Sequence, residues 1–372
     1  MEFDRPLKIA QIAPLAESVP PQGYGGTERV VANLTDALVE MGHEVTLFAS
    51  GDSATNAYLV AGREKALRLD PNPLKSDPSA HFAMLHEVRK QRQEFDILHF
   101  HTDILHFPFF EDFAAQTLTT LHGRLDIPDL AEVFRRWPQY PLASISDHQR
   151  RPARFANWRG TVQHGIPTDL FAFSENHRGV LAFVGRIAPE KRADRAIEIA
   201  RRAGMTLRIA AKVDAADRVY FQEIIEPQFD THVDFMGEIG DFQKNELLGS
   251  AAALLFPIDW PEPFGMVMIE AMACGTPVIA WDEGAVSEII DDGVTGFIVR
   301  SIDAAVEAIH RVDTLDRQAV RTTFERRFSA AAMSNNYLRL YAEALRPAPR
   351  LADNASNRRE IRAARGDRAV RA

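Results

Sequence analysis

The chain has 372 residues, of which 46% are hydrophobic and 26% charged, and its formal net charge is −9. This composition is typical of a globular protein long enough for two domains, and the negative charge argues against nucleic acid as a partner. The single cysteine, Cys274, excludes an internal disulfide and fits a reducing compartment. The first residues lack the apolar core of a signal peptide, and no stretch reaches the roughly 18 apolar residues of a membrane-spanning helix. We therefore expect a cytoplasmic protein.

Short apolar runs alternate with helical patterns through the first half of the chain. Residues 7–14 form a predicted strand, and residues 27–42 carry apolar side chains at helical spacing up to Gly42. A second helical pattern covers residues 79–94. Further predicted strands cover residues 44–50, 95–101, 116–122, 141–146 and 161–166.

The same alternation repeats in the second half, with helical patterns between the strands. Near-continuous apolar strands separated by helices are typical of parallel sheets covered on both faces. Two such series, parted near residues 165–179, predict two doubly wound α/β domains that face each other across a cleft, where a ligand would bind. The predicted strands cover residues 180–185, 206–212, 233–237, 252–257, 276–281 and 296–299.

We assign residues 1–168 to an N-terminal domain and residues 175–329 to a C-terminal domain. Residues 346–372 differ in kind, because they hold eight Arg against three acidic residues and few large apolar side chains. Such a segment cannot bury enough apolar surface to order itself, which favours a solvated tail. The alternative is an electrostatic anchor to anionic lipid, which would give weak peripheral contact with the inner face of the membrane.

Two loops at predicted strand ends carry features of anion sites. Residues 22–29, Q-G-Y-G-G-T-E-R, follow the first strand, and their glycines would let backbone amides approach a phosphate. A flexible turn explains this pattern equally well. Residues 185–191, G-R-I-A-P-E-K, follow the first strand of the second half, and Arg186 and Lys191 would suit a diphosphate. The alternative there is a solvated loop whose cations pair with Glu190.

The segment W-P-E-P-F-G-M-V-M-I-E-A-M-A-C-G-T-P-V-I-A covers residues 260–280. It follows a predicted strand, so a helix should start near Gly265 and direct its unpaired first amides into the cleft. Glu270 would lie about 7.5 Å along that helix, with Glu262 just outside it. Two carboxylates around a set of amides suit a ligand with hydroxyls at both ends and anionic charge between them, as in a nucleotide sugar. Separately, each Glu could be an ordinary helix or loop charge.

Histidines follow two strands of the first half. His122, in L-H-G, could reach into the cleft, although a lone histidine is usually structural. H-F-H-T-D, residues 99–103, adds His101 and Asp103. His99 and His101 share one face of a strand, but no third ligand has a convincing spacing and no Asp-x-Asp occurs, which argues against a metal.

These motifs occur in order between about Leu7 and Leu345. With them the chain resembles the retaining glycosyltransferases of family four, which have the GT-B fold of two facing Rossmann-like domains. His164 is the one departure, because that family more often has Asn before the following Gly. The residues that carry the resemblance are Gly25-Gly26, His122-Gly123, H-G-I-P-T-D-L-F at 164–171, Gly185-Arg186 with Lys191, and Glu262 and Glu270 with seven residues between them.

The resemblance implies a role for each motif. Glu270 would bind the ribose hydroxyls of the donor, and Glu262 would lie beside its sugar. Arg186 and Lys191 would neutralise the diphosphate leaving group, and His122 would contact the hexose. These last four residues are the catalytic candidates.

Further donor contacts would come from backbone groups of two loops. Acceptor-side candidates are His101, Asp103 and Arg124, and residues 330–345 would form the helix that returns to the N-terminal domain in this family. The loop residues expected to bind the donor are Gly25 and Gly26 in the first half, and Phe264, Gly265, Met266 and Val267 in the second.

The functional hypothesis is transfer of a hexose from a nucleoside diphosphate to an acceptor hydroxyl, with α configuration retained, in saccharide or polysaccharide biosynthesis. UDP-glucose and GDP-mannose both fit as donors, and the acceptor could be a saccharide, a lipid-linked intermediate or a small metabolite. No cofactor or metal is expected, because cationic side chains and helix amides can meet the charge of the leaving group. The alternatives are a non-catalytic nucleotide-sugar binding paralogue and a nucleotide-sugar epimerase on the same fold.

Overall fold

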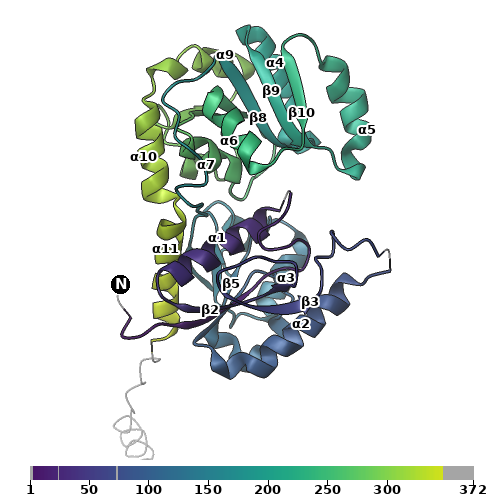
Figure 1. The fold of residues 1–372 in the computed structure, drawn as a ribbon, viewed down its shortest axis with the longest axis vertical. Helices are drawn as coiled ribbons and strands as arrows, with labels where there is room; N and C mark the ends of the chain where they lie inside the picture. Colours follow the sequence, from purple (N-terminus) through teal and green to yellow (C-terminus); the bar gives the residue numbers. More distant parts are fainter. Residues whose placement is uncertain (1–2, 24, 73, 347–372) are drawn as a thin grey trace, which may run out of the picture.

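The computed structural model describes residues 3–23, 25–72 and 74–346. This part of the chain forms two α/β domains stacked along the long axis of the molecule (Figure 1). Each domain contains one sheet, with seven strands in the N-terminal domain and six in the C-terminal domain, and all strand pairs within them are parallel. The predicted fold class is therefore confirmed.

The N-terminal sheet has the strand order β3-β2-β1-β4-β5-β6-β7, so the strand order reverses between β1 and β4. In doubly wound sheets a ligand cleft forms at this reversal. The strands are β1 Lys8–Ile12, β2 Glu44–Ser50, β3 Tyr58–Arg63, β4 Ile97–Phe100, β5 Thr117–Thr120, β6 Leu142–Ser144 and β7 Trp158–Thr161. The helices of this domain are α1 Gly26–Glu40, α2 Asp77–Gln91 and α3 Pro128–Arg136.

The C-terminal sheet has the order β10-β9-β8-β11-β12-β13 and reverses between β8 and β11. Its strands are β8 Val180–Arg186, β9 Thr206–Lys212, β10 Val233–Gly237, β11 Ala251–Phe256, β12 Val278–Trp281 and β13 Gly296–Val299. Its helices are α4 Ala193–Ala203, α5 Arg218–Tyr220, α6 Asp241–Ser250, α7 Met266–Ala273, α8 Val286–Ile289, α9 Ile302–Ile309 and α10 Arg317–Arg327.

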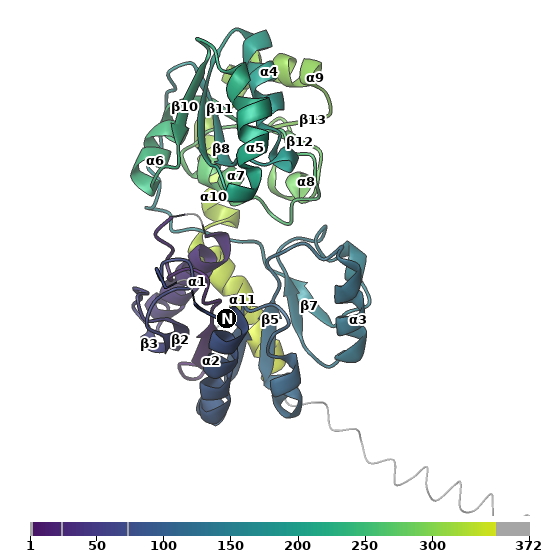
Figure 2. The same ribbon diagram turned by 90° about the vertical axis from the view of Figure 1, so that its right-hand side faces the viewer.

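Helix α11, Ala330–Ala344, runs from the C-terminal domain back along the N-terminal domain (Figures 1 and 2). Its buried Tyr337 and Tyr341 share a core cluster with Ile9 of β1 and Ile97 of β4. The N-terminal sheet is therefore covered on one face by a helix that the sequence supplies last.

One predicted strand is wrong. Residues 161–166 do not form a strand; β7 ends at Thr161 and the chain then crosses toward the other domain. At this crossing the backbone of Ile166 bonds to the start of α11 instead of a sheet neighbour, accepting from the Ala330 amide at 2.8 Å and donating to the Phe328 carbonyl at 3.0 Å. Strand β3 and helix α3 were not predicted, and the other strands agree within a few residues at their ends.

The predicted Arg-rich tail lies, from residue 347 onward, outside the described residues. Among the residues that are described, no helix has the length and apolar character needed to span a membrane.

Arg321 of α10 joins the crossing segment to the C-terminal domain. Its guanidinium donates to the carbonyl oxygens of Phe171 at 2.9 Å and Thr168 at 2.6 Å, and also to that of Ala273 at the end of α7. The residue is 9% exposed. Charge-assisted bonds to buried carbonyls are among the stronger hydrogen bonds in proteins, so this side chain fixes the position of the crossing segment.

We expect Arg321→Met to lower the free energy of unfolding by about 3 kcal/mol, because three carbonyl acceptors lose their donor. Urea denaturation followed by circular dichroism measures this. Arg326, exposed on the same helix, is the matched control, and Arg326→Met should change stability by less than about 0.5 kcal/mol. Equal effects of the two substitutions would contradict this interpretation.

Candidate active site

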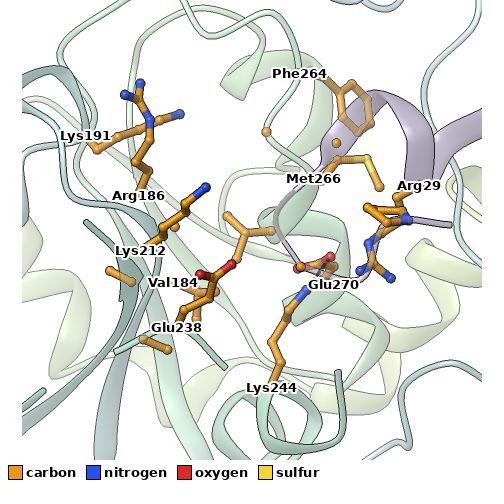
Figure 3. A pocket seen from close by; sticks show the side chains of 18 of the residues that line it. Arg29, Val184, Arg186, Lys191, Lys212, Glu238, Lys244, Phe264, Met266 and Glu270 are labelled. Atoms are coloured by element: carbon orange, nitrogen blue, oxygen red, sulfur yellow. Dashed lines mark hydrogen bonds and ion pairs between the residues drawn. The ribbon is translucent and has the colours of Figure 1, made fainter. Parts of the chain in front are cut away.

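A cavity of about 420 Å³ lies between the two domains. It is bordered by the carboxyl ends of β8 and β9, the start of α7 and the loop before α1 (Figure 3). The predicted residues that line it are Gly26, His122, Arg186, Lys191, Glu262, Phe264, Gly265, Met266, Val267 and Glu270. The sequence motifs that were far apart are thus brought to one place.

Helix α7 starts at Met266, directly after Gly265. Gly265 has φ of +90°, and a Cβ there would come within 2.8 Å of the Met268 side chain and 3.0 Å of the Phe256 ring. The backbone conformation therefore favours glycine, and a larger residue would in addition have to displace the end of the Met268 side chain. The tight turn places the first residues of α7 against the cavity, where helix amides lack partners within the helix and can bind an anion.

Glu262 and Lys191 form an ion pair at the wall of the cavity. The Trp260 indole also donates to the Glu262 carboxylate, at 2.9 Å. The Glu262 backbone also packs closely against Gly284. A Cβ at position 284 would lie 2.4 Å from both the nitrogen and the oxygen of Glu262, so only glycine leaves room there. Both charged side chains are mostly buried, at 12% and 14% exposure, so the pair is fixed in direction and only weakly screened.

Arg186 lines the cavity and is also paired with acidic side chains. Its guanidinium bonds to Glu190 at 2.7 Å and to Asp217 at 3.0 Å. The pairing with Glu190 that we weighed as the alternative for this loop is therefore present. It does not remove Arg186 from the cavity, and it orients the guanidinium there.

A chain of ion pairs crosses the cleft at the other carboxylate. Glu270 is 4% exposed and accepts from Lys244 at 3.0 Å. Lys244 also lies 3.4 Å from Asp241, which pairs with Arg29 of the N-terminal domain at 2.7 Å. Figure 3 shows Arg29, Lys244 and Glu270 directed toward one another. The buried charge of Glu270 is compensated in this way, and its carboxylate is held at the cavity wall.

His122 lies at the N-terminal side of the cavity, where its ring packs against that of His164 with centroids 5.2 Å apart. Its Nε2 is 2.9 Å from Nδ1 of His101, and its Nδ1 is buried without a hydrogen-bond partner among the described residues. Burial lowers the pKa of His122 to about 3, because the charged imidazolium would lose its hydration. His122 is therefore neutral near neutral pH.

Four predicted residues lie outside the cavity lining. His101 is buried and bonded to His122 and Gln11, so it lies behind the wall and cannot touch an acceptor. Asp103 is exposed, and exposed Arg124 bonds to Asp126 at 2.6 Å. A Cβ on Gly25 would meet Pro21 and Glu17, so Gly25 faces the interior of its own loop.

Within the described part of the chain, no group of three or more His, Cys, Asp or Glu side chains is arranged to hold a metal ion. The ring nitrogens of His99 are bonded to Tyr341 at 2.7 Å and Thr120 at 2.8 Å. His99 and His101, which share one strand face, thus have both ring nitrogens in hydrogen bonds with other side chains.

Several charged residues of the cavity were not singled out from the sequence. Two of them lie at strand ends, Lys212 as the last residue of β9 and Glu238 directly after β10, and the rule that identified Arg186 would have found them. Arg29, Asp241 and Lys244 lie on helices, and no local pattern marks them.

Two solved glycosyltransferase structures are similar in fold to this chain. The solved structure of AviGT4, a glycosyltransferase involved in avilamycin A biosynthesis, superposes with a TM-score of 0.70 at 25% identity, over 92% of this chain and 99% of that chain. HepE of Anabaena, in complex with UDP and glucose, has a TM-score of 0.66 at 16% identity, over 91% of this chain and 100% of that one, which supports the fold alone. The protein is a glycosyltransferase with the GT-B fold.

Sequence similarity then gives the family. Residues 24–162 match the family described as Glycosyltransferase Family 4, and residues 170–325 match Glycosyl transferases group 1. Phosphatidyl-myo-inositol mannosyltransferase of Mycolicibacterium smegmatis is 26% identical, over 87% of this chain and 88% of that protein. D-inositol 3-phosphate glycosyltransferase of Frankia alni is 30% identical over 45% of this chain and 46% of its own. The chain belongs to the family-four glycosyltransferases.

The buried histidines should make stability depend on pH. Burial holds the pKa of His99, His101 and His164 well below the usual range, as it does for His122. The unfolded chain binds protons on these groups below about pH 6.5, so stability is present above that pH and is lost as the pH falls. Each such histidine should cost about 1.4 kcal/mol between pH 7.5 and 5.5.

Urea titrations at several pH values measure how steeply the free energy of unfolding falls as the pH is lowered, which gives the number of protons taken up on unfolding. His164→Asn should lower that number by about one. His86→Gln, a change at an exposed position of α2, should leave it unchanged. A wild-type stability that is flat between pH 7.5 and 5.5 would show that these histidines are not held neutral.

Proposed function

We propose that the protein is a retaining hexosyltransferase that moves a hexose from a nucleoside diphosphate to an acceptor hydroxyl with α configuration. One observation supports this most strongly. Lys191, Arg186 and the amino end of α7 line the same cavity as the buried Glu270. Together they offer cationic and amide donors for a diphosphate and a carboxylate for hydroxyls, which is the complement of a nucleotide sugar.

The cations would act on the leaving group. When the bond between the sugar and the diphosphate breaks, negative charge grows on the phosphate oxygen. Fixed donors aimed at that charge lower the barrier, and removing one typically costs about 2.7–4 kcal/mol. Lys191 is held by Glu262 and Arg186 by Glu190 and Asp217, so both are oriented before the donor binds. This pre-orientation is what electrostatic catalysis requires.

The carboxylates would bind hydroxyls. Glu270 would accept from the ribose, with Lys244 balancing its charge. Glu262 would lie beside the hexose. We assign neither carboxylate a nucleophilic role. In retaining glycosidases the two carboxylates lie about 5–5.5 Å apart, on either side of the bond that breaks. Here each carboxylate is held in an ion pair with a different lysine, Glu262 with Lys191 and Glu270 with Lys244. The proposed route is front-side attack, in which the leaving phosphate takes the proton of the acceptor hydroxyl.

The donor is proposed to be UDP-glucose or GDP-mannose. The mycobacterial relatives are named mannosyltransferases of phosphatidyl-myo-inositol, and HepE was solved with UDP and glucose. The acceptor would be a saccharide, a lipid-linked intermediate or a small metabolite, met in the cytoplasm or at the inner face of the membrane. The N-terminal loops would choose the acceptor.

Thermal shift with UDP, GDP, ADP and their sugars should identify the donor. A nucleotide that binds only the folded protein stabilises it by mass action and so raises the melting temperature. At a ligand concentration of a hundred times Kd, the free energy of unfolding rises by about 2.7 kcal/mol. Glu270→Gln should remove most of this shift, while Glu198→Gln on α4, outside the cavity, should keep it. Equal shifts for all nucleotides or for none would reject the donor assignment.

Arg186→Ala and Lys191→Ala should each lower kcat at least tenfold at saturating donor, because each removes a donor to the leaving diphosphate. Arg202→Ala is the control, since Arg202 is exposed on α4 and pairs with Asp303. Initial rates of nucleotide release in the presence of acceptor measure the effect. Wild-type turnover in both variants would remove the basis of the mechanism.

A further inference from the structure

A buried hydrogen-bond chain connects α11 to the wall of the cavity. It starts at the Tyr341 hydroxyl, which lies 3.2 Å from Nε2 of Gln11. Oε1 of Gln11 lies 2.8 Å from Nε2 of His101, and Nδ1 of His101 lies 2.9 Å from Nε2 of His122. Gln11, His101 and Tyr341 are each at most 2% exposed. The chain therefore runs through the interior of the N-terminal domain and ends on a residue of the proposed donor site.

The chemistry of each group gives this chain a direction. The Gln11 amide nitrogen can only donate, so the Tyr341 oxygen accepts from it, and the amide oxygen can only accept. Nε2 of His101 must then carry the proton, which leaves its Nδ1 as an acceptor. Nε2 of His122 donates to that acceptor, so Nδ1 of neutral His122 keeps a lone pair.

The opposite direction has a higher cost. With the Gln11 amide reversed, every bond could reverse, and the proton of His122 would move to Nδ1. That atom is buried and has no partner among the described residues. A buried N–H without an acceptor is rarer in proteins than an acceptor without a donor. The direction that leaves a lone pair on His122 is therefore the favoured one.

The far end of the chain is compatible with this direction. Having accepted from Gln11, the Tyr341 hydroxyl is free to donate its own proton to Nδ1 of His99, at 2.7 Å. Nε2 of His99 then donates to Thr120 Oγ1 at 2.8 Å. Thr120 in turn bonds to the Tyr337 hydroxyl at 3.0 Å, also on α11. Each of these buried groups has a partner of the right kind, as a stable buried network requires.

We propose that Gln11, His101 and Tyr341 are positioning residues that fix the tautomer of His122 with its proton on Nε2. The buried Nδ1 of His122 then carries a lone pair and no proton, so His122 borders the donor site as a neutral ring whose only N–H is bonded to His101. It does not protonate the leaving diphosphate. The effect on sugar transfer rests on the proposed function, whereas the tautomer is a property of the protein alone.

This arrangement assigns α11 a function beyond packing. A helix that follows the C-terminal domain in the sequence sets the proton position on a residue just after β5 of the N-terminal sheet. In serine proteases a buried group that holds the wrong histidine tautomer lowers kcat by about 10⁴. A smaller effect is expected here, since His122 moves no proton.

The test measures the tautomer directly, on the full chain without substrate. Protein labelled with ¹⁵N-histidine is studied by long-range ¹H–¹⁵N correlation, and the His122 signals are assigned by their loss in His122→Phe. The wild type should show His122 protonated on Nε2. Tyr341→Phe and Gln11→Met should each produce a mixture of tautomers and lower kcat/KM at least about tenfold.

Tyr140→Phe is the matched control. Tyr140 is equally buried in the same domain, and its hydroxyl donates to the Phe107 carbonyl outside this chain. It should keep the wild-type tautomer and a rate within twofold of wild type. Two substitutions in the chain are used so that a folding failure in one leaves the other to decide.

A wild-type His122 protonated on Nδ1 would overturn the inference, as would an unchanged tautomer in both Tyr341→Phe and Gln11→Met. If the tautomers behave as expected but no sugar is transferred to any acceptor, the proposed function fails while the positioning chain stands.

Discussion

The left-handed turn at Gly265 is the constraint on which the site depends. Its φ of +90° is a conformation that L side chains rarely adopt, so the turn from the loop after β11 into α7 strongly favours glycine. The turn sets where the first amides of α7 lie and, one turn further, where Glu270 enters the cavity. Without it the two carboxylates would not face the same space as Arg186 and Lys191, at the end of β8.

Much of this could be read from the sequence because parallel sheets bring their carboxyl ends to one edge. Arg186 ends β8 and Glu262 follows β11, and these strands are neighbours in the sheet although about 75 residues separate the two side chains in the sequence. Strand β3 was missed because its residues are at least partly exposed and include Gly62, so it lacks the buried apolar run that marks a central strand.

His101 shows what the sequence could not provide. Its strand pattern placed it correctly beside His99 on one face, at a strand end near the cleft. Whether that face opens to a ligand or is covered depends on α11, which lies more than 200 residues later and packs against it. Contacts between such distant segments leave no local pattern in the sequence. His101, predicted to contact the acceptor, is therefore buried in the structure and does not line the cavity.

The two domains contribute different kinds of group to the cavity, and this division has a mechanical consequence. The C-terminal domain supplies most of the charged groups of the cavity, whereas the N-terminal domain supplies neutral His122 and the cation Arg29. The two domains are joined at the cavity by Arg29 of α1. It pairs with Asp241, which also pairs with Lys244, the partner of Glu270. A ligand that competes for Glu270 changes the balance of charge around Lys244 and hence the strength of the Arg29 contact. The four side chains therefore form one chain of partly buried charges that joins α1 to the wall of the cavity, and screening by salt is weak along it.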